Sequence, residues 1–255
     1  MMPALYPILE FDPNPEAILN PRHNTGEPDL PERGVLCFFA DVLRKLVEDG
    51  TLVKIGTLYS EIGPNQIYGM EWEGQRLFVF HPGVGAPLSA AFLEETIALG
   101  GRKFIACGGC GVLDQEIMAG HALVLRSAVR AEGTSYHYLP PAREAEASPQ
   151  AVSVLRAVLE RHGVPYLTGK AWTTDGIYRE TEALRAQRLA EGCQVVEMEA
   201  AAFFAVAQFR GVTFGQVVYG GDLVVPEGWD KRDWMNRADV RQMLFWLAVE
   251  AAAEL

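Results

Sequence analysis

Short apolar runs alternate with segments of helical periodicity through the middle and C-terminal half of the chain, and this order limits the fold more than any other feature. Buried strands are predicted at "RKFIACGGCGVL", "HALVLRSAVR" and "TFGQVVYGGDLV". Helical segments such as "VEMEAAAFFAVAQF" lie between or beside them. Strands that alternate with helices favour a largely parallel sheet covered on both faces. The expected fold class is therefore α/β.

Glycine and polar residues predict several boundaries. A helix is expected over 35–50, where apolar residues recur at helical spacing and Gly50 ends the pattern. Glu73–Gly74 interrupts an alternating segment, which indicates a hairpin turn. A further helix is expected between Ser148, a plausible N-cap, and the stop at Gly163. "RKFIACGGCGVL" is expected to run from a short strand into a glycine loop.

Length and charge exclude several classes of function. The 255 residues have 49% hydrophobic side chains, so we expect one domain over 1–255 around a large core. The net charge of -11 and the lack of a basic stripe argue against nucleic acid as a partner. No apolar run has the length of a membrane span, and no signal peptide is recognisable, so we expect a cytoplasmic protein without membrane contact. With nucleic acid and membrane disfavoured, the expected partner is a small molecule.

The cysteines and histidines suggest no metal or cofactor. Cys37, Cys107, Cys110 and Cys193 are too few for a disulfide scaffold and are expected to be free buried thiols. Cys107 and Cys110 form a C-x-x-C, but no second Cys or His pair follows at metal-ligand spacing. His81, which lies between a strand and a glycine turn, is expected to be structural.

Four segments with glycines or hydroxyl residues follow predicted strands. Ligands of open α/β sheets bind beyond the carboxyl ends of the strands, where such segments gather. Taken singly, each segment is more typical of a tight turn. Taken together, they predict one pocket, formed by Gly83–Gly85, Gly108–Gly111, Thr173–Tyr178 and Gly220–Asp222.

Two carboxylates stand immediately before an apolar helix in "VVEMEAAAFF", at Glu197 and Glu199. Glu199 is expected in the first turn of that helix, where the positive end of the helix dipole favours a negative charge. The residues alone leave two interpretations open. Glu199 either stabilises the helix or accepts hydrogen bonds from a ligand.

The chain resembles the superfamily of nucleoside phosphorylases and nucleosidases. The resemblance spans roughly residues 50 to 225 and rests on motifs in the family's order and spacing. It implies a three-layer fold with a central mixed, partly barrel-like sheet flanked by helices, in homodimers or trimers of dimers. It also implies an enzyme, a pentosyltransferase that cleaves the N-glycosidic bond of a nucleoside. The motifs are "GVGAPLSAAFLEETIALGGRKFIACGGCGVL", "TTDGIYRET", "VVEMEAAAFFAVAQFRGV" and "VVYGGDLV".

The same resemblance implies a ribose site. Met198 would pack under the sugar, and Glu199 would accept hydrogen bonds from the ribose 2′ and 3′ hydroxyls. A carboxylate suits two adjacent donors because charge-assisted hydrogen bonds are stronger than neutral ones. Glu197 would be a ribose residue or a part of the scaffold.

Asp222 would be the catalytic residue, because the aspartate at its motif position protonates N7 of the leaving base in purine-acting members. Such a general acid needs a raised pKa. The alternative is an aspartate that caps the next turn. Gly221 stands where the family usually has a serine, so a hydrogen bond that orients the aspartate is expected to be missing.

The resemblance also implies a base site. Tyr178 would stack on the base or sugar, with Cys110 and Gly111 completing the base-binding set. Thr181 and Ala183 stand where uridine phosphorylases have the Gln and Arg that read uracil. Recognition of a pyrimidine is therefore disfavoured, and a purine is expected.

The phosphate site departs most from the family. The N-terminal segment reads "FDPNP", without the family's glycine and arginine, and Ala106 and Gly109 stand where purine phosphorylases have an arginine and a hydroxyl residue. Backbone N–H groups of Gly108 and Gly109, in the glycine loop, would form an anion site instead. The arginines available to add charge from other loops or a second subunit are Arg22, Arg33, Arg76 and Arg179.

Three functions follow. The favoured one is a phosphorylase of purine salvage that uses inorganic phosphate as a co-substrate and yields ribose 1-phosphate. The second is a nucleosidase in which Glu16, or alternatively Glu10, activates water. The third is a catalytically silent nucleoside-binding protein. In the C-terminal segment, Trp229, Trp234 and Trp246 are expected to be packing anchors and not a lid.

Overall fold

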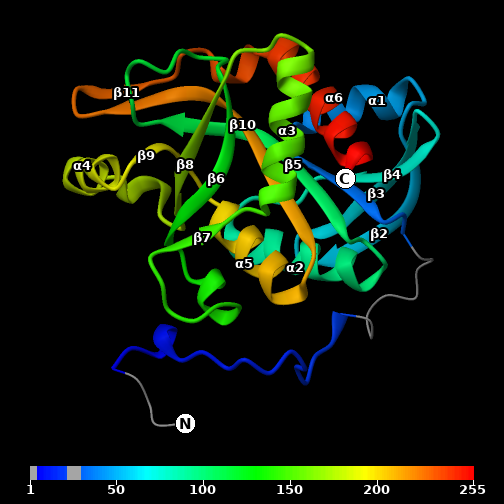
Figure 1. The fold of residues 1–255 in the computed structure, drawn as a ribbon, viewed down its shortest axis with the longest axis horizontal. Helices are drawn as coiled ribbons and strands as arrows, with labels where there is room; N and C mark the ends of the chain where they lie inside the picture. The colour runs from blue at the N-terminus through cyan, green and yellow to red at the C-terminus, as the bar shows by residue number, and fades with distance from the viewer. Residues whose placement is uncertain (1–4, 22–29) are drawn as a thin grey trace.

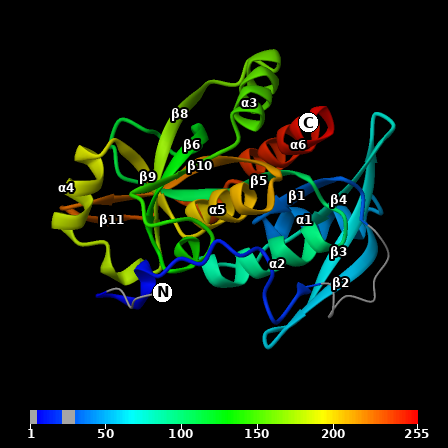
Figure 2. The ribbon, with the colours of Figure 1, turned by 60° about the horizontal axis from the view of Figure 1, so that its bottom comes forward.

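One large mixed sheet with helices on both faces forms the protein (Figures 1 and 2). The computed structural model describes residues 5–21 and 30–255, apart from the side chain of Met235. The strands are β1 (Arg33–Cys37), β2 (Val53–Ser60), β3 (Gly63–Trp72), β4 (Gln75–Phe80), β5 (Lys103–Val112), β6 (Ala122–Ala131), β7 (Glu144–Glu146), β8 (Tyr166–Thr174), β9 (Cys193–Glu197), β10 (Thr213–Val225) and β11 (Gly228–Asp230). The α-helices are α1 (Ala40–Glu48), α2 (Ala86–Ala98), α3 (Pro149–Arg161), α4 (Glu182–Ala190), α5 (Ala200–Arg210) and α6 (Ala238–Glu254).

The strand pairings form a ring with an extension. Pairings run from β5 through β9, β8, β6 and β10 and return to β5, while β1, β4, β3 and β2 continue the sheet from the first half of the β5 edge that β9 also uses. Parallel and antiparallel pairs are mixed. The expected α/β fold with a mixed, partly barrel-like sheet is confirmed.

The helices make the two outer layers. Helices α1, α3 and α6 pack on one face over a core that includes Val35, Ile105 and Val217. Helices α2 and α5 pack together on the opposite face over Phe104 and other aromatic side chains. Figure 2 shows α2 and α5 side by side beneath the sheet and α3 and α6 above it. None of the helices in the described segments has the length and apolar character that a membrane span requires.

The helix expected over 35–50 is partly wrong. Residues 33–37 form the central strand β1, and the helix begins only at Ala40. Strand β1 is buried between β4 and β5, so its run of apolar residues suits a strand as well as a helix. The predicted end of the helix is confirmed, since Gly50 follows α1 with φ at +80°.

Other predicted boundaries are confirmed, with one difference in detail. Glu73 and Gly74 both have positive φ and join β3 to β4 as a hairpin. Helix α3 begins after Ser148 and ends before Gly163, whose φ is +62°. The Ser148 hydroxyl does not cap α3. It accepts a hydrogen bond from the N–H of Phe214 at 2.9 Å and ties α3 to β10.

The predicted glycine loop at Gly108–Gly111 is wrong, because β5 continues through it to Val112. None of these glycines has the positive φ that an anion nest requires. Two of them allow close packing instead. A Cβ at Gly108 would lie 3.0 Å from the ring of Phe38, and one at Gly109 would lie 3.4 Å from the ring of Tyr219.

Strand β5 changes neighbours along these glycines. Its pairing with β1 ends at Cys107, and its pairing with β9 begins at Gly111. In the described part of the chain, no strand pairs with residues 108–110 on this side of β5. Such a divergence of strands is where ligands bind in α/β sheets. The candidate site lies at this point.

Candidate active site

The two glutamates of the apolar-helix motif lie at a tight corner between β9 and α5. Glu197 is the last residue of β9, and Glu199 is the N-cap of α5. Both side chains are buried, at 7% and 6% exposure. Glu199 therefore stands at the N-cap, one position before the first turn in which it is expected. Its predicted closeness to the helix N-terminus is confirmed.

Glu197 holds the corner together. Its Oε2 accepts the N–H groups of Glu199 at 2.8 Å and Ala200 at 2.6 Å, and its Oε1 accepts the hydroxyl of Thr173 at 2.5 Å. The hydroxyl of Thr173 also accepts the N–H of Ala201 at 3.0 Å. These contacts are those of a scaffold residue, because the carboxylate binds the helix N-terminus and the neighbouring strand.

Glu199 points toward the segment that opens α2. The N–H of Gly85 donates a hydrogen bond of 2.6 Å to Oε1 of Glu199, and the φ of Gly85 is +91°. Burial, with the charge of Glu197 as a second cause, raises the pKa of Glu199 above the usual carboxyl value. Burial likewise raises the pKa of Glu197. Met198, between the two glutamates, is half-buried at the surface of this corner.

Asp222 lies near the end of β10, the strand that pairs with β5. A Cβ at Gly111 would stand 3.7 Å from Oδ2 of Asp222 and 2.9 Å from the side chain of Val196, so Gly111 leaves room between β9 and Asp222. The indole Nε1–H of Trp229 donates a hydrogen bond of 2.6 Å to the same Oδ2. A donor to this aspartate was expected to be missing, and β11 supplies one.

Cys110 lies close to the carboxylates. Burial raises the pKa of its thiol well above the usual value, and the charges of Glu197 and Asp222 act in the same direction. The thiol donates to the carbonyl of Tyr219 at 3.3 Å. All four cysteines are free and buried, as expected. Cys110 therefore contributes an inert apolar wall.

The four segments predicted to form one pocket come together on one sheet edge. Gly85 contacts Glu199, Thr173 contacts Glu197, and Gly111 adjoins Asp222. Glu197 ends β9 and Asp222 lies in β10, and these two strands pair with opposite edges of β5, so the two carboxylates flank the end of β5. A sugar site and a base site can therefore adjoin each other here.

Glu180 belongs to this group, although no motif singled it out. It is half-buried and follows the short 3-10 helix η4 (Ile177–Arg179). Burial and then the charge of Asp222 raise its pKa to about 7. Perturbed carboxyl groups of this kind are concentrated in functional sites. The sequence offers no signal for Glu180, because its environment comes from β10, more than 40 residues away.

Tyr178 and Glu16 are not brought to the carboxylates of this chain. The side chain of Tyr178 is 94% exposed. Glu16 lines a cavity of about 230 Å³ beside Arg210, at the C-terminal end of α5. An 11-residue helix is about 16 Å long, and Glu199 lies at its other end. Glu10, the alternative base, is exposed in the same N-terminal segment.

The proposed arginines do not gather here either. Arg33 and Arg76 lie near the N-terminal ends of β1 and β4, the edge opposite the carboxylates. Arg179 is exposed on η4, and Arg22 lies outside the described residues. Among the residues that the structure describes, no arginine hydrogen-bonds Glu197, Glu199 or Asp222, and no group of three or more metal-ligating side chains is present.

His81 and two of the three tryptophans have structural contacts. The Nδ1 atom of His81 accepts the N–H of Gly83 at 3.0 Å, and burial lowers the pKa of the ring. Its ring also lines a cavity of about 560 Å³ between α1 and β3, which does not include the carboxylates. Trp234 lies against Arg241, and Trp246 packs on Trp72. Trp229 differs, because it binds Asp222 and remains 57% exposed.

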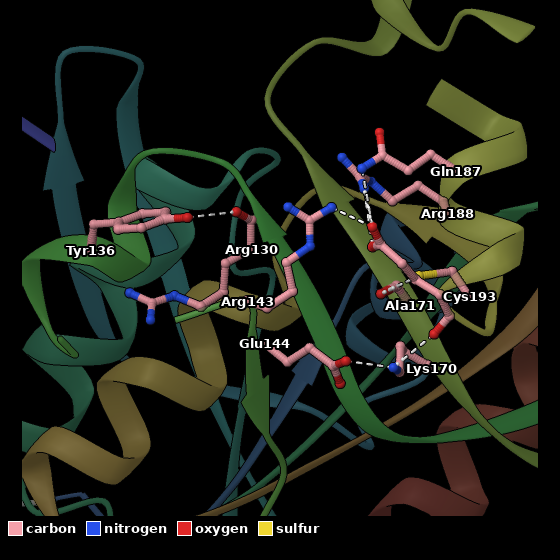
Figure 3. A network of polar contacts seen from close by, with 10 residues as sticks. Arg130, Tyr136, Arg143, Glu144, Lys170, Ala171, Gln187, Arg188 and Cys193 are labelled. Atoms are coloured by element: carbon pink, nitrogen blue, oxygen red, sulfur yellow. Dashed lines mark hydrogen bonds and ion pairs between the residues drawn. The ribbon is translucent and has the colours of Figure 1, made fainter. Parts of the chain in front are cut away.

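A polar network joins the middle of β8 to the start of β9 (Figure 3). Lys170 binds Glu144 on β7 and donates to the carbonyl of Glu191 at 2.9 Å. The guanidinium groups of Arg143 and Arg188 both bind the carboxylate of Glu191. These contacts tie β7, β8 and α4 together, so β8 is held at its middle and β9 at its start, away from the segment that carries Thr173 and Glu197.

Comparison with known proteins shows the family of the chain. A family model described as the phosphorylase superfamily matches residues 32–244. A guanosine phosphorylase of Halorubrum lacusprofundi is 28% identical over 185 residues, which cover 72% of this chain and 74% of that protein. A uridine phosphorylase of Thermococcus kodakarensis is 29% identical over 58% of each chain, so the chain spans somewhat more than half of that relative.

Solved structures share the fold. The crystal structure of a uridine phosphorylase from Vibrio fischeri has a TM-score of 0.74 at 22% identity and covers 89% of this chain and 93% of that one. A purine nucleoside phosphorylase from Toxoplasma gondii, in complex with immucillin-H, has a TM-score of 0.76 at 19% identity and covers 89% and 92%. An AMP nucleosidase from Bacteroides thetaiotaomicron has a TM-score of 0.69 at 21% identity and covers 87% of each chain.

Proposed function

Because the chain belongs to the phosphorylase superfamily, we propose that it cleaves the N-glycosidic bond of a purine nucleoside with inorganic phosphate and releases the base and ribose 1-phosphate. Its named relatives are phosphorylases, which are pentosyltransferases, and the chain is an enzyme of this type. The choice of a purine and of phosphate as the nucleophile is our proposal. So is assembly into a homodimer or a trimer of dimers.

One observation carries the proposal. A buried carboxylate at the β9–α5 corner and a second carboxylate near the end of β10 flank the end of β5, because β9 and β10 pair with its two edges. Glu199 would accept the ribose 2′ and 3′ hydroxyls, and the half-buried Met198 would pack under the sugar. Two hydroxyl donors would also stabilise the ionised form of Glu199 and offset the cost of its burial.

Glu197 has a different role in this proposal. Its carboxylate is occupied by Thr173 and two backbone N–H groups, so it orients Glu199 and does not bind the sugar. Carboxylates at a helix N-terminus are favoured by the helix dipole and by unpaired N–H groups. Glu197 is therefore a positioning residue.

The preference for a purine rests on Asp222 and Thr181. Asp222 would supply a proton to N7 of the leaving base as the glycosidic bond breaks. The hydroxyl of Thr181, at the place of a uracil-reading glutamine, accepts the N–H of Leu184 and caps α4. The guanosine phosphorylase among the relatives supports the same preference.

Phosphate would approach β5 where its edge lacks a partner strand. Gly108 and Gly109, for which the sequence predicts backbone donors, lie there without side chains to exclude an anion; within the strand only the N–H of Gly109 faces the unpaired edge, so it is the proposed donor, while that of Gly108 faces β10. The guanidinium groups that phosphate usually requires would then come from a second copy of the chain. Tyr178, exposed in this chain, would stack on the base once substrate is bound.

The test is an assay of base release from adenosine, inosine, guanosine, uridine and methylthioadenosine, each with and without phosphate. Release of a purine only with phosphate, together with ribose 1-phosphate, is the expected result. Release in phosphate-free buffer would make the enzyme a nucleosidase, with Glu16→Gln as the variant that tests its base. Binding of nucleosides by calorimetry without any release would mean a catalytically silent protein.

A matched pair of variants distinguishes an effect on the proposed ribose site from a general effect of replacing a glutamate. Glu199→Gln should abolish most turnover, and Glu48→Gln, on the exposed face of α1, should not change it. Equal activity in the two variants would remove the β9–α5 corner from the proposed ribose site.

A further inference from the structure

Asp222 lies in an irregular part of β10. The register of β10 with β5 shifts between Gly220 and Leu223, so that three steps along β10 match two steps along β5. The extra residue makes a β-bulge that contains Gly221 and Asp222. Bulges beside functional sites redirect a side chain away from its regular position in the sheet. The orientation of the Asp222 carboxylate therefore depends on contacts outside the ladder with β5.

Gly221, the residue before this aspartate, cannot supply such a contact. It has no side chain, and the space around it is filled. A Cβ at Gly221 would lie 3.2 Å from the carbonyl oxygen of Cys110 and 3.2 Å from Cβ of Trp234. These distances are shorter than ordinary van der Waals contacts between heavy atoms. A donor to Asp222 consequently has to come from another strand.

Strand β11 brings Trp229 to Asp222. Trp229 pairs with Val224 in antiparallel register, and Val224 and Asp222 are two residues apart in β10. Both border the space beside Gly111, where a Cβ would lie 3.4 Å from Val224 and 3.7 Å from Oδ2 of Asp222. Trp229 is thus a diagonal neighbour of Asp222, within reach of a long aromatic side chain. Its indole Nε1–H donates a hydrogen bond of 2.6 Å to Oδ2.

The indole determines which oxygen of Asp222 can hold a proton. An indole N–H is a donor only, so Oδ2 acts as the acceptor whether the carboxyl group is ionised or protonated. A proton on this carboxyl group therefore belongs on Oδ1. In the described part of the chain no group hydrogen-bonds Oδ1, which leaves this oxygen for a ligand.

We propose that Trp229 is a positioning residue, whose indole N–H holds Oδ2 of Asp222, confines the transferable proton to Oδ1 and aims that oxygen at N7 of the purine. The role rests on the proposed function, since it concerns the leaving base of the same reaction. Asp222 is the catalytic residue, and Trp229 acts through it without contacting the substrate.

The step needs no further reactant. The C1′–N9 bond breaks and its electron pair goes to the purine, while a phosphate oxygen forms the new bond to C1′. The proton on Oδ1 moves to N7 and leaves Asp222 ionised. The proton that hydrogen phosphate loses on forming the ester passes to solvent, from which the carboxylate regains one.

The test compares guanosine with 7-methylguanosine. The second nucleoside carries a methyl group and a positive charge at N7, so its base leaves without a proton from the enzyme. Trp229→Phe keeps an aromatic ring and removes the N–H donor. It should lower kcat for guanosine about tenfold, the effect of one hydrogen bond to a charged group, and leave KM within about twofold. Turnover of 7-methylguanosine should stay within about twofold of the unchanged enzyme, which also shows that the variant is folded.

Trp72→Phe is the matched control. It makes the same chemical change at an indole whose buried Nε1 has no hydrogen-bond partner among the residues that the structure describes. Trp72 is the last residue of β3, in the extension of the sheet and not in the ring of strands that carries the carboxylates. This variant should turn over both nucleosides as the unchanged enzyme does. Equal losses on guanosine in Trp72→Phe and Trp229→Phe would overturn the assignment.

A double variant tests whether Trp229 acts through Asp222. Asp222→Asn keeps an oxygen that can accept from the indole but holds no transferable proton. It should lower guanosine turnover about 100-fold, the scale of general acid catalysis, and spare 7-methylguanosine. With Asp222→Asn in place, Trp229→Phe should change guanosine turnover by less than about twofold, because no proton remains to be aimed. A further tenfold loss would overturn the proposal.

The hydrogen bond also has a spectroscopic signature. The chain has five tryptophans, and the indole N–H signal that is missing from ¹⁵N-labelled Trp229→Phe belongs to Trp229. Asp222→Ala removes the acceptor and should shift that signal. A signal that does not move would overturn the contact, whatever reaction the protein catalyses.

Failure of this proposal differs from failure of the proposed function. Equal losses on the two nucleosides in Trp229→Phe, or a loss confined to KM, would mean that the indole binds the base and does not position the acid. Either result would overturn the proposal and leave phosphorolysis in place. An unchanged enzyme that cleaves neither nucleoside with phosphate, or cleaves uridine alone, would overturn the proposed function and this role with it.

Discussion

The backbone N–H of Gly85 donates a hydrogen bond of 2.6 Å to Oε1 of Glu199, which lies 114 residues further along the chain. This bond joins the segment that opens α2 to the N-cap of α5. It stabilises the position of one carboxylate oxygen. Glutamine at position 199 can keep the same bond through its amide oxygen, which makes Glu199→Gln a conservative probe.

Glu199→Gln should lose activity and keep its fold. A charge-assisted hydrogen bond is worth about 1.5 to 3 kcal/mol, so kcat/KM for a nucleoside should fall roughly 10-fold to 150-fold. Steady-state kinetics at saturating phosphate measures the loss, and circular dichroism checks the fold. An unchanged kcat/KM would mean that Glu199 does not touch the substrate.

The same variant should be less sensitive to pH in its stability. Burial raises the pKa of Glu199 above its ordinary value of 4.5, so above that pH the folded protein binds a proton that the unfolded chain has released. Stability of the unchanged protein should therefore fall as pH rises from about 5 through the raised pKa. Glutamine does not titrate. Melting temperatures between pH 5 and 9 should show a smaller decline in Glu199→Gln, and equal slopes would contradict this.

Thr173→Val should destabilise the β9–α5 corner. The hydroxyl both donates to Glu197 and accepts from Ala201, and valine leaves these buried groups without it. The expected loss is about 1 to 3 kcal/mol in the free energy of unfolding, measured by urea denaturation. Thr168→Val, at an exposed position of the same strand, is the control and should change little.

Breaking the ion pair between α2 and α5 should cost more than removing both partners. Arg210 binds Glu94 through two nitrogens and also donates to the carbonyl of Pro15 at 2.8 Å. Arg210→Met leaves the buried Glu94 without its cation and with only the Tyr138 hydroxyl as a partner, and should lower stability by about 3 kcal/mol. The double variant Arg210→Met with Glu94→Leu should recover part of that loss in urea denaturation. A strictly additive double variant would argue against the pairing.

Gly111→Ala should impair the reaction more than the fold. The added methyl would lie 2.9 Å from Val196, so the valine side chain must move, and it would fill the space 3.7 Å from the Asp222 carboxylate. We expect a cost of about 1 to 3 kcal/mol in stability and a larger relative loss in kcat/KM. Gly56→Ala is the control, since its Cβ meets Ile67 at an ordinary 3.6 Å. Full activity in Gly111→Ala would show that the space beside Asp222 is not used.

The sequence predicted the elements whose signals are local. Gly50, Gly74 and Gly163 end or turn their segments through positive φ, a property of single residues. Strand β1 escaped prediction, because a short apolar run buried on both sides has no period that separates a strand from a helix. The glycines from Gly108 onward suggest a loop, but they belong to β5, where the absence of a side chain lets aromatic rings pack on the strand.

The site was also predictable only in part, because some of its contacts join residues that are far apart in the sequence. Glu197 and Glu199 stand next to each other in a motif, so the corner they form could be found from the sequence. The bond from Trp229 to Asp222 depends on the register of β10 with β11, and the bond from Gly85 to Glu199 joins two distant segments. "PEGWD" after a strand does suggest a hairpin, which is the one signal that could have pointed to Trp229.

The site is divided between a buried part and a peripheral part. Glu199, Glu197 and Thr173 lie among β8, β9 and α5. Trp229 comes from the β10–β11 hairpin, and Glu180 comes from the short segment before α4. Changes in the two peripheral segments disturb few core contacts, and changes at the corner disturb many. Substitutions in the two peripheral segments should therefore alter the surroundings of Asp222 at little cost to the fold, whereas substitutions at the β9–α5 corner should also destabilise the core.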